Sequence, residues 1–235
     1  MRRISTNSSA KLEALRACRY FSSLSDEILI PLTEATHLCR YDAGEMVFLE
    51  GEPSEGLCII KQGSVKLYKV SPQGRELIVN TFEDGDSFNE VPVFDSQGNP
   101  VSVAALDESE IWVVGADAIR DAMHQHPEVA QAFILNLSQN LRMLVGMVEE
   151  LSFYQVTTRL ARLISNLPTE QLVGNASQRL TQDDLAARVG TVREVVARSL
   201  RKLERSGAIE VSRQKIHVIN KGRLIEWAHL PYDEV

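Results

Sequence analysis

The residues best suited to chemistry form a short charged run in the last third of the chain. Arg193 and Arg198 can each donate a pair of parallel hydrogen bonds to guanine, and Glu194 can accept one from the amino group of cytosine. The spacing of these three side chains therefore favours recognition of double-stranded DNA. The residues that we expect at a DNA interface are Thr191, Val192, Arg193, Glu194, Arg198 and Arg201.

Two short helices joined by a tight turn would hold these side chains. Thr181 with Asp184, and Thr191 with Glu194, each fit the capping-box spacing that satisfies free amides at a helix start. Gly190 lies between the two helices, where a helix end commonly needs a left-handed residue. Apolar residues at helical spacing allow the two helices to pack together: Leu185, Val189, Val196, Leu200 and Leu203.

A predicted β-hairpin follows the second helix. Residues 208–212 and 215–219 form its strands, with Arg213 and Lys215 near the tip, where they can contact phosphates. We also expect Arg201 to contact a phosphate rather than a base. The alternative is a basic, solvated helix in which Glu194 serves only as a cap. Two capped helices, a glycine turn and a hairpin together favour a winged helix-turn-helix.

The segment from Gly190 to Arg198 resembles the recognition element of the CRP/FNR family of bacterial transcription regulators. The Arg-Glu-x-x-x-Arg pattern is similar to the CRP type of reader, and Ala197 stands where the FNR type has serine. The resemblance extends from about Leu15 to Trp227. It implies a transcription regulator that reads a palindromic site with TGTGA-like half-sites and contacts RNA polymerase.

The composition is that of a globular protein with more than one domain. At 235 residues, 44% hydrophobic and 24% charged, the chain is long enough for two cores. No apolar run approaches the roughly 20 residues of a membrane helix, and the N-terminal arginines precede no apolar segment. Cys18, Cys39 and Cys58 are too few for a disulfide framework, so we expect a cytoplasmic protein with no membrane partner.

Charge is unevenly distributed along the chain. Residues 152–235 carry 13 Lys and Arg against 9 Asp and Glu, a net +4, whereas residues 1–151 carry 12 against 23, a net −11. An acidic front part and a basic back part fit a sensor domain joined to a nucleic-acid-binding domain. A chance asymmetry would give the same numbers.

The patterns predict an α+β protein with three parts. Residues 1–10 are polar and expected to be mobile, and residues 11–35 have the spacing of short helices. Short alternating runs with glycine turns then indicate a β-roll, which resembles the cyclic-nucleotide-binding roll of the same family. We expect a sensor domain over 11–126, a dimerisation helix over 127–153 and a DNA-binding domain over 154–235.

Apolar residues on the expected long helix recur at alternating spacings of four and three. This heptad pattern stays on one face only when the helix pairs with another, which favours a homodimer. Packing of the helix on its own β-roll is the alternative, and the two arrangements are compatible. The seam that we expect consists of Ile134, Leu137, Leu141, Leu144, Val148 and Leu151.

The resemblance also locates an effector pocket, and this chain departs from the family there. Relatives that bind cyclic AMP have Gly-Glu followed by Arg-Ser or Arg-Thr. Here Glu90 matches, but Asn89 replaces the glycine, and Asn99 and Pro100 replace the arginine and the hydroxyl residue. A phosphate in this pocket would meet Glu90 and no cation, so we predict no tight binding of a cyclic nucleotide.

The long helix departs from the family as well. Relatives hold adenine with Thr-Ser, where this chain has Leu144 and Val145. The effector, if one exists, is therefore unknown, and we expect no metal and no cofactor. The residues that we assign to the pocket are Phe88, Asn89, Glu90, Asn99, Leu144 and Val145.

Other functions of the same fold remain open. A haem-based gas or redox sensor would need iron ligands, for which the chain offers His37, His124, His126, Met143 and Met147. An iron–sulfur cluster needs four suitable cysteines, and the chain has three. A β-barrel enzyme is the alternative of a different class, but no catalytic set, metal-binding His-x-His pair in the barrel or Walker loop stands out.

Overall fold

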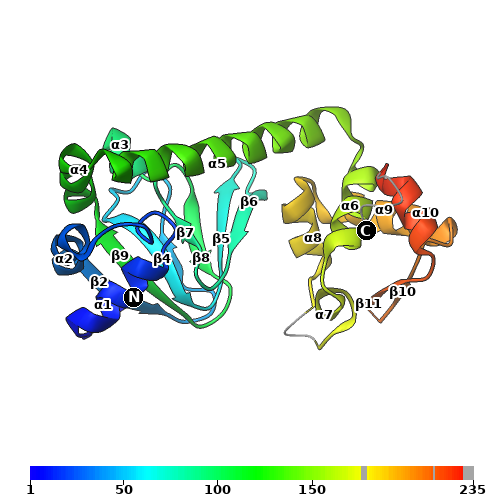
Figure 1. Ribbon diagram of the computed structural model, residues 1–235. Helices are drawn as coiled ribbons and strands as arrows, with labels where there is room; N and C mark the ends of the chain where they lie inside the picture. The colour runs from blue at the N-terminus through cyan, green and yellow to red at the C-terminus, as the bar shows by residue number, and fades with distance from the viewer. Residues whose placement is uncertain (176–178, 214, 230–235) are drawn as a thin grey trace. The chain divides into compact units, whose positions relative to one another are not determined.

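The computed structural model describes residues 1–175, 179–213 and 215–229. These residues form two compact units (Figure 1). The first unit consists of residues 1–69 and 79–142, and the second consists of residues 70–78 and 143–235.

The chain contains both helices and antiparallel strands, which confirms the predicted α+β class. The strands are β1 (Arg2–Ile4), β2 (Thr36–Tyr41), β3 (Met46–Phe48), β4 (Gly56–Gln62), β5 (Val65–Val70), β6 (Glu76–Phe82), β7 (Ser87–Phe88), β8 (Ser102–Ala105), β9 (Ser109–Gly115), β10 (Ile209–Ser212) and β11 (Lys215–Val218). The helices are α1 (Ser8–Ala17), α2 (Asp26–Glu34), α3 (Val91–Asp95), α4 (Ala116–Gln125), α5 (Pro127–Phe153), α6 (Val156–Asn166), α7 (Thr169–Val173), α8 (Gln182–Val189), α9 (Arg193–Arg205) and α10 (Lys221–Ala228).

The predicted β-roll is built from two antiparallel sheets. One has the strand order β1-β2-β9-β4-β7 and the other has the order β3-β8-β5-β6. Cys39 lies opposite Ile111 and Cys58 opposite Val113 across the neighbouring strand β9, so all four belong to one buried core. Cys39 and Cys58 are buried free thiols.

The expectation of a mobile N-terminus is wrong. Arg2–Ile4 forms strand β1, which pairs antiparallel with β2 so that Ile4 lies opposite Leu38. The reason is that β2 would otherwise be an exposed edge strand with unpaired amide and carbonyl groups. A three-residue strand with two arginines carries too little hydrophobic alternation to be recognised from its own sequence.

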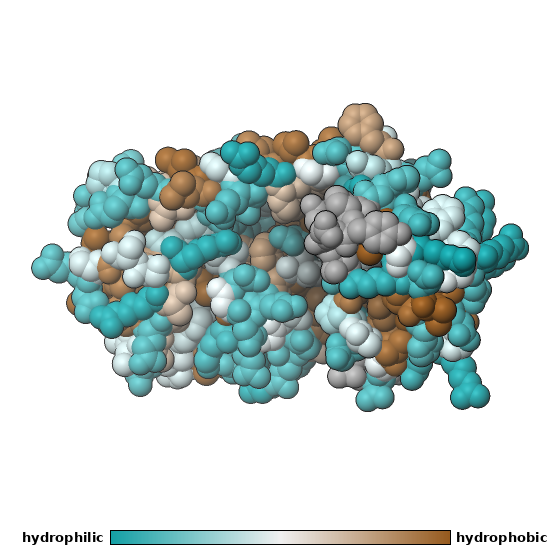
Figure 2. All heavy atoms as spheres, turned by 45° about the vertical axis from the view of Figure 1, so that its right-hand side comes forward, coloured by the Kyte–Doolittle hydropathy of each residue, from teal (hydrophilic) through white to brown (hydrophobic). Residues whose placement is uncertain are grey.

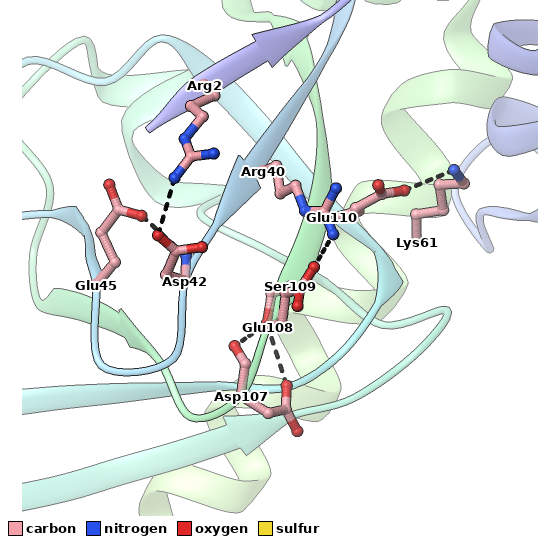
Figure 3. A network of polar contacts seen from close by, with 9 residues as sticks. All are labelled: Arg2, Arg40, Asp42, Glu45, Lys61, Asp107, Glu108, Ser109 and Glu110. Atoms are coloured by element: carbon pink, nitrogen blue, oxygen red, sulfur yellow. Dashed lines mark hydrogen bonds and ion pairs between the residues drawn. The ribbon is translucent and has the colours of Figure 1, made fainter.

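Exposed ion pairs surround the end of this sheet (Figure 3). Arg2 Nη2 lies 3.2 Å from Asp42 Oδ2, and Lys61 Nζ lies 2.7 Å from Glu110 Oε2. Arg40 pairs with Glu108. Such surface pairs contribute little to stability, so this cluster orients neighbouring strands rather than forming a site.

Helices α1, α2 and α4 gather on one side of the strands (Figure 1). Leu15, Phe21 and Leu29 of the N-terminal segment share a buried cluster with Trp112 of β9 and Phe133 of α5. The first two turns of α5 therefore belong to the core of the first unit. No helix in the described part of the chain is long and apolar enough to cross a membrane.

Helix α5 changes character along its length. Val129, Phe133 and Asn136 are buried, but the apolar side chains further along are largely exposed. Hydrophobic side chains appear at the top of the view in Figure 2, the level at which α5 runs in Figure 1. Most of the predicted seam is uncovered, and its exposed members are Ile134 (61%), Leu141 (63%), Leu144 (42%), Val148 (64%) and Leu151 (40%).

The second unit packs its helices around one apolar core. Helices α6, α8, α9 and α10 and the β10–β11 hairpin contribute to it (Figure 1). The core includes Leu160, Leu185, Val196, Leu200 and Ile216. The link between α5 and α6 is only Tyr154–Gln155.

Candidate nucleic-acid interface

The first helix of the predicted helix-turn-helix begins and ends as its sequence indicates. Thr181 Oγ1 accepts from the amide of Asp184 at 3.1 Å, and Asp184 Oδ2 accepts from the amide of Thr181 at 2.8 Å. These reciprocal bonds form the predicted capping box. Gly190 ends α8 with φ +66°, a conformation that residues with a Cβ adopt only with strain.

The predicted cap of the second helix is wrong. The N-cap of α9 is Val192, and no side chain accepts a hydrogen bond there. The amide of Thr191 donates to the carbonyl of Ala186 at 2.9 Å, so Thr191 completes the end of α8. Helix α9 therefore begins one residue later than a cap at Thr191 would require. For this reason Glu194 has no capping role.

Helix α9 separates an apolar face from a charged face. Val196, Leu200 and Leu203 are at most 3% exposed and lie in the core of the unit. Arg193, Glu194, Arg198 and Arg201 are all exposed on the other side. Residues 194, 198 and 201 follow the spacing of one helical face. Thr191 and Val192 lie half-buried at the turn that precedes this helix.

One contact of the charged face was not expected from the sequence. Arg193 Nη1 lies 3.7 Å from Asp183 Oδ2, on the first turn of α8, and both side chains are more than 60% exposed. An ion pair this long and this exposed is weak, so it leaves the guanidinium available to a base. Asp183 lies ten positions before Arg193 in the sequence, and the turn between α8 and α9 brings the two side chains together.

The predicted wing is present as an antiparallel hairpin. Ile209 pairs with Val218 and Ser212 pairs with Lys215. The amide of Val211 donates to Glu204 Oε1 at 3.0 Å, which ties the hairpin to α9. Arg213 is exposed near the hairpin tip, and Lys215 is half-buried at the start of β11.

The predicted effector region is a small cavity inside the β-roll. It has a volume of about 150 Å³, and its walls include Tyr41, Phe48, Asn89 and Asn99. Asn89 Nδ2 donates to Asn99 Oδ1 at 3.1 Å, so the structure brings these two predicted residues together. Among the residues described, no arginine or lysine lines this cavity.

The structure separates Glu90 from this cavity, contrary to the expectation that a ligand there would meet it. Tyr20 donates to Glu90 Oε1, and Asn136 Nδ2 donates to the same oxygen at 3.2 Å. The three side chains are at most 6% exposed, and Tyr20 stacks on Phe133 at 4.2 Å between ring centroids. Glu90 is therefore a structural acid that joins the N-terminal segment to α3 and α5.

The remaining predicted pocket residues are not assembled around the cavity. Phe88 is 1% exposed and packs in the roll core with Phe48 and Phe82. Leu144 and Val145 belong to the second unit and have exposed side chains. Sequence alone could not find Tyr20 and Asn136 as partners of Glu90, because they lie 70 and 46 positions away.

Two family profiles match the chain. A profile for the cyclic nucleotide-binding domain matches residues 38–126, and a profile for the Crp-like helix-turn-helix domain matches residues 158–227. The two matches correspond to the β-roll and to the helices and hairpin of the second unit.

Curated relatives and solved structures agree with these profiles. The chain is 27% identical over 217 residues to the CRP-like cAMP-activated global transcriptional regulator of Mycobacterium tuberculosis, covering 90% of this chain and 97% of the relative. It is 29% identical to the cAMP-activated global transcriptional regulator Vfr of Pseudomonas aeruginosa, covering 74% and 86%.

Solved structures show the same fold. The c-di-GMP responsive global regulator CLP of Xanthomonas campestris superposes with a TM-score of 0.68 at 21% identity, covering 83% of this chain and 100% of that one. A CRP/FNR-family transcriptional regulator of Thermus thermophilus superposes with a TM-score of 0.65 at 24% identity, covering 82% and 98%.

The buried Glu90 predicts a pH dependence of stability. Burial raises the pKa of its carboxyl, against the hydrogen bonds from Tyr20 and Asn136, so the folded state holds this proton more tightly than the unfolded chain. The stability that this proton contributes is complete below the unfolded pKa, about 4.3, and is lost as pH rises through the folded pKa. Glu90→Gln keeps an acceptor for both donors and should flatten this loss.

Denaturant unfolding at a series of pH values measures the effect. We expect Glu90→Gln to gain stability relative to the native chain as pH rises from the unfolded carboxyl pKa, about 4.3, through the raised pKa of the folded state. Glu13→Gln, at an exposed position, should keep the native profile. A Glu90→Gln profile parallel to the native one would show that Glu90 does not cause the dependence.

Proposed function

Because the chain belongs to the CRP/FNR family of transcription regulators, we propose that it acts as a homodimer that reads a palindromic DNA site with TGTGA-like arms. The observation that carries this proposal is the two-faced helix α9. Its apolar face is buried in the unit, and its opposite face exposes two arginines and a glutamate at the spacing of base contacts. Such a helix-turn-helix places its second helix in the major groove.

The proposed roles follow from side-chain chemistry. Arg193 and Arg198 each bind a guanine, and Glu194 binds a cytosine amino group. Thr191 and Val192 flank these contacts, and Arg201 binds phosphate together with the hairpin. The lack of a capping role for Glu194 supports its assignment to a base.

The exposed seam on α5 supports the homodimer. A run of large apolar side chains that are 40–64% exposed is unfavourable in water, and the heptad spacing suits a second copy of the same helix. A two-fold dimer then offers two α9 helices to successive major grooves, about 34 Å apart. As a regulator it would act in the cytoplasm and contact RNA polymerase.

We further propose that DNA binding does not depend on cyclic AMP. The relatives from M. tuberculosis and P. aeruginosa are named as cAMP-activated. In this chain, Asn89 and Asn99 fill the corresponding region and bond to each other, and no arginine or lysine among the described residues lines the cavity. A cyclic phosphate would lose its hydration there without gaining a counter-charge.

The base contacts predict a specificity change. Arg193→Ala or Arg198→Ala should each cost about 1–3 kcal/mol in binding to the preferred duplex and relax selection at one base pair in each arm. Fluorescence anisotropy with the preferred site and with single-substitution duplexes measures both effects. Arg40→Ala, on the β-roll, is the matched control. Equal losses on specific and random DNA would contradict base reading.

The seam predicts a monomeric variant. Leu141→Glu places a charge in the proposed helix pair and should shift the protein to a monomer, with loss of tight binding to the full palindrome. Leu135→Glu is the matched control, because Leu135 is 68% exposed on the same helix but lies outside the seam. Sedimentation velocity gives the mass. A Leu141→Glu dimer, or an equal effect of both variants, would refute the seam.

The effector proposal predicts no calorimetric response to cyclic AMP. Titration of the full-length protein should show no saturable binding at micromolar nucleotide, and the nucleotide should leave affinity for the palindrome unchanged. Micromolar binding, or a DNA affinity that rises on adding the nucleotide, would overturn this part of the proposal. The DNA-reading role would stand in either case.

A further inference from the structure

A buried arginine in the second unit has no hydrogen-bond or ion-pair partner among the residues that the structure describes. Arg159, in the first turn of α6, is 8% exposed. No hydrogen bond or ion pair is formed by its guanidinium within the described residues, and its Nε is buried without an acceptor. Burial lowers the pKa of this guanidinium, and the negative charge of Glu150 offsets that effect only in part. An unpaired buried charge is costly enough that such groups usually hold a counter-ion.

Arg159 faces a cavity that can hold one. The cavity has a volume of about 490 Å³, within the range of small-molecule sites. Its walls combine Arg159, Arg162 and Arg188 with Asn166 and the apolar Leu163. Charged donors together with apolar side chains are the usual composition of a site for a polar metabolite.

Arg162 is already held in place by its neighbours. Its Nη1 lies 3.0 Å from Glu150 Oε1, its Nε donates to the carbonyl of Ala228 at 2.8 Å, and its guanidinium lies 3.9 Å from the ring centroid of Tyr154. Glu150 is therefore neutralised by Arg162. Glu149 is the other acid in the wall, so the cavity keeps a net positive charge from its three arginines.

We propose that this cavity binds a small molecule that carries a phosphate group. A guanidinium matches the oxygens of phosphate in paired hydrogen bonds, and Arg159 has its donors available for them. A DNA backbone is a poor alternative, because a side chain that is 8% exposed is out of reach of a duplex. The apolar wall would take the rest of the metabolite.

The location gives the ligand a regulatory role, which rests on the proposed function. The cavity is walled by the last turns of α5, by α6 and by the end of α8, the first helix of the helix-turn-helix. A ligand there bridges both sides of the two-residue link at Tyr154–Gln155. It would bias the orientation of the DNA-reading helices if its affinity differs between their arrangements.

Calorimetric titration of the full-length protein with pyrophosphate, at constant ionic strength and without DNA, tests the site. We expect one saturable site per protomer, weakened at least about tenfold by Arg159→Met, which keeps volume but removes the charge and its donors. Arg159→Lys keeps the charge without the paired donors and should lie between the two. Arg40→Met, which removes an exposed guanidinium of the β-roll, should leave the affinity unchanged.

Two results would overturn the inference. One is no saturable heat at millimolar pyrophosphate, and the other is equal affinity in Arg159→Met and the native protein. If Arg159→Met does not fold, Arg159→Lys and Arg188→Met decide the question by the same comparison. Binding of the palindrome by each variant is measured separately, so loss of the anion site with DNA binding retained is distinguishable from failure of the DNA-reading role.

Discussion

The proposed function depends on the burial of one face of α9. Val196, Leu200 and Leu203 lie in the core of the second unit, and burial of each such side chain contributes on the order of 1.5–3 kcal/mol. With these positions fixed, the rotation of the helix about its axis is fixed as well. Arg193, Glu194 and Arg198 must then face solvent, whatever they bind. The same packing that stabilises the unit therefore sets the surface that it presents to DNA.

The parts that the sequence predicts best are those with local causes. The capping box at Thr181 depends on residues three positions apart, and the glycine turn at Gly190 depends on one backbone conformation. The heptad spacing on α5 is also a local signal, and most of its apolar residues are exposed in the single chain, but the seam itself stays a prediction. The strands of the β-roll follow from alternation and glycine turns. Each of these signals is contained within a short window.

The parts that the sequence could not predict depend on partners far away in the sequence, or on a helix start that is shifted by one residue. Thr191 matches a capping box, but the turn after α8 uses it to satisfy the carbonyl of Ala186. Strand β1 forms because β2 offers an open edge, not because Arg2–Ile4 has strand character. Glu90 occupies a ligand position by resemblance, yet Tyr20 and Asn136 bind its carboxylate. Only the folded chain brings those groups together.

The two cavities that could bind an effector, one in the β-roll and one beside Arg159, differ in the charge of the side chains that line them. In the β-roll, Asn89 and Asn99 are neutral amides that bond to each other, and we propose that this cavity does not hold a cyclic phosphate. In the second unit, Arg159 keeps a buried charge with no hydrogen-bond partner for its Nε among the described parts of the chain. We infer that the capacity to sense an anion has a place near the helix-turn-helix rather than in the roll.

Selection of binding sites from a random duplex library by the purified protein, with no effector added, tests the central claim most directly. The account predicts recovery of a palindrome with TGTGA-like arms whose centres lie one helical turn apart, about 10 base pairs or a multiple of it. Such a site would support the two-fold dimer and the base contacts in one experiment. Enrichment of an asymmetric single site, or of no sequence at all, would contradict the account of a dimer that reads DNA through α9 without cyclic AMP.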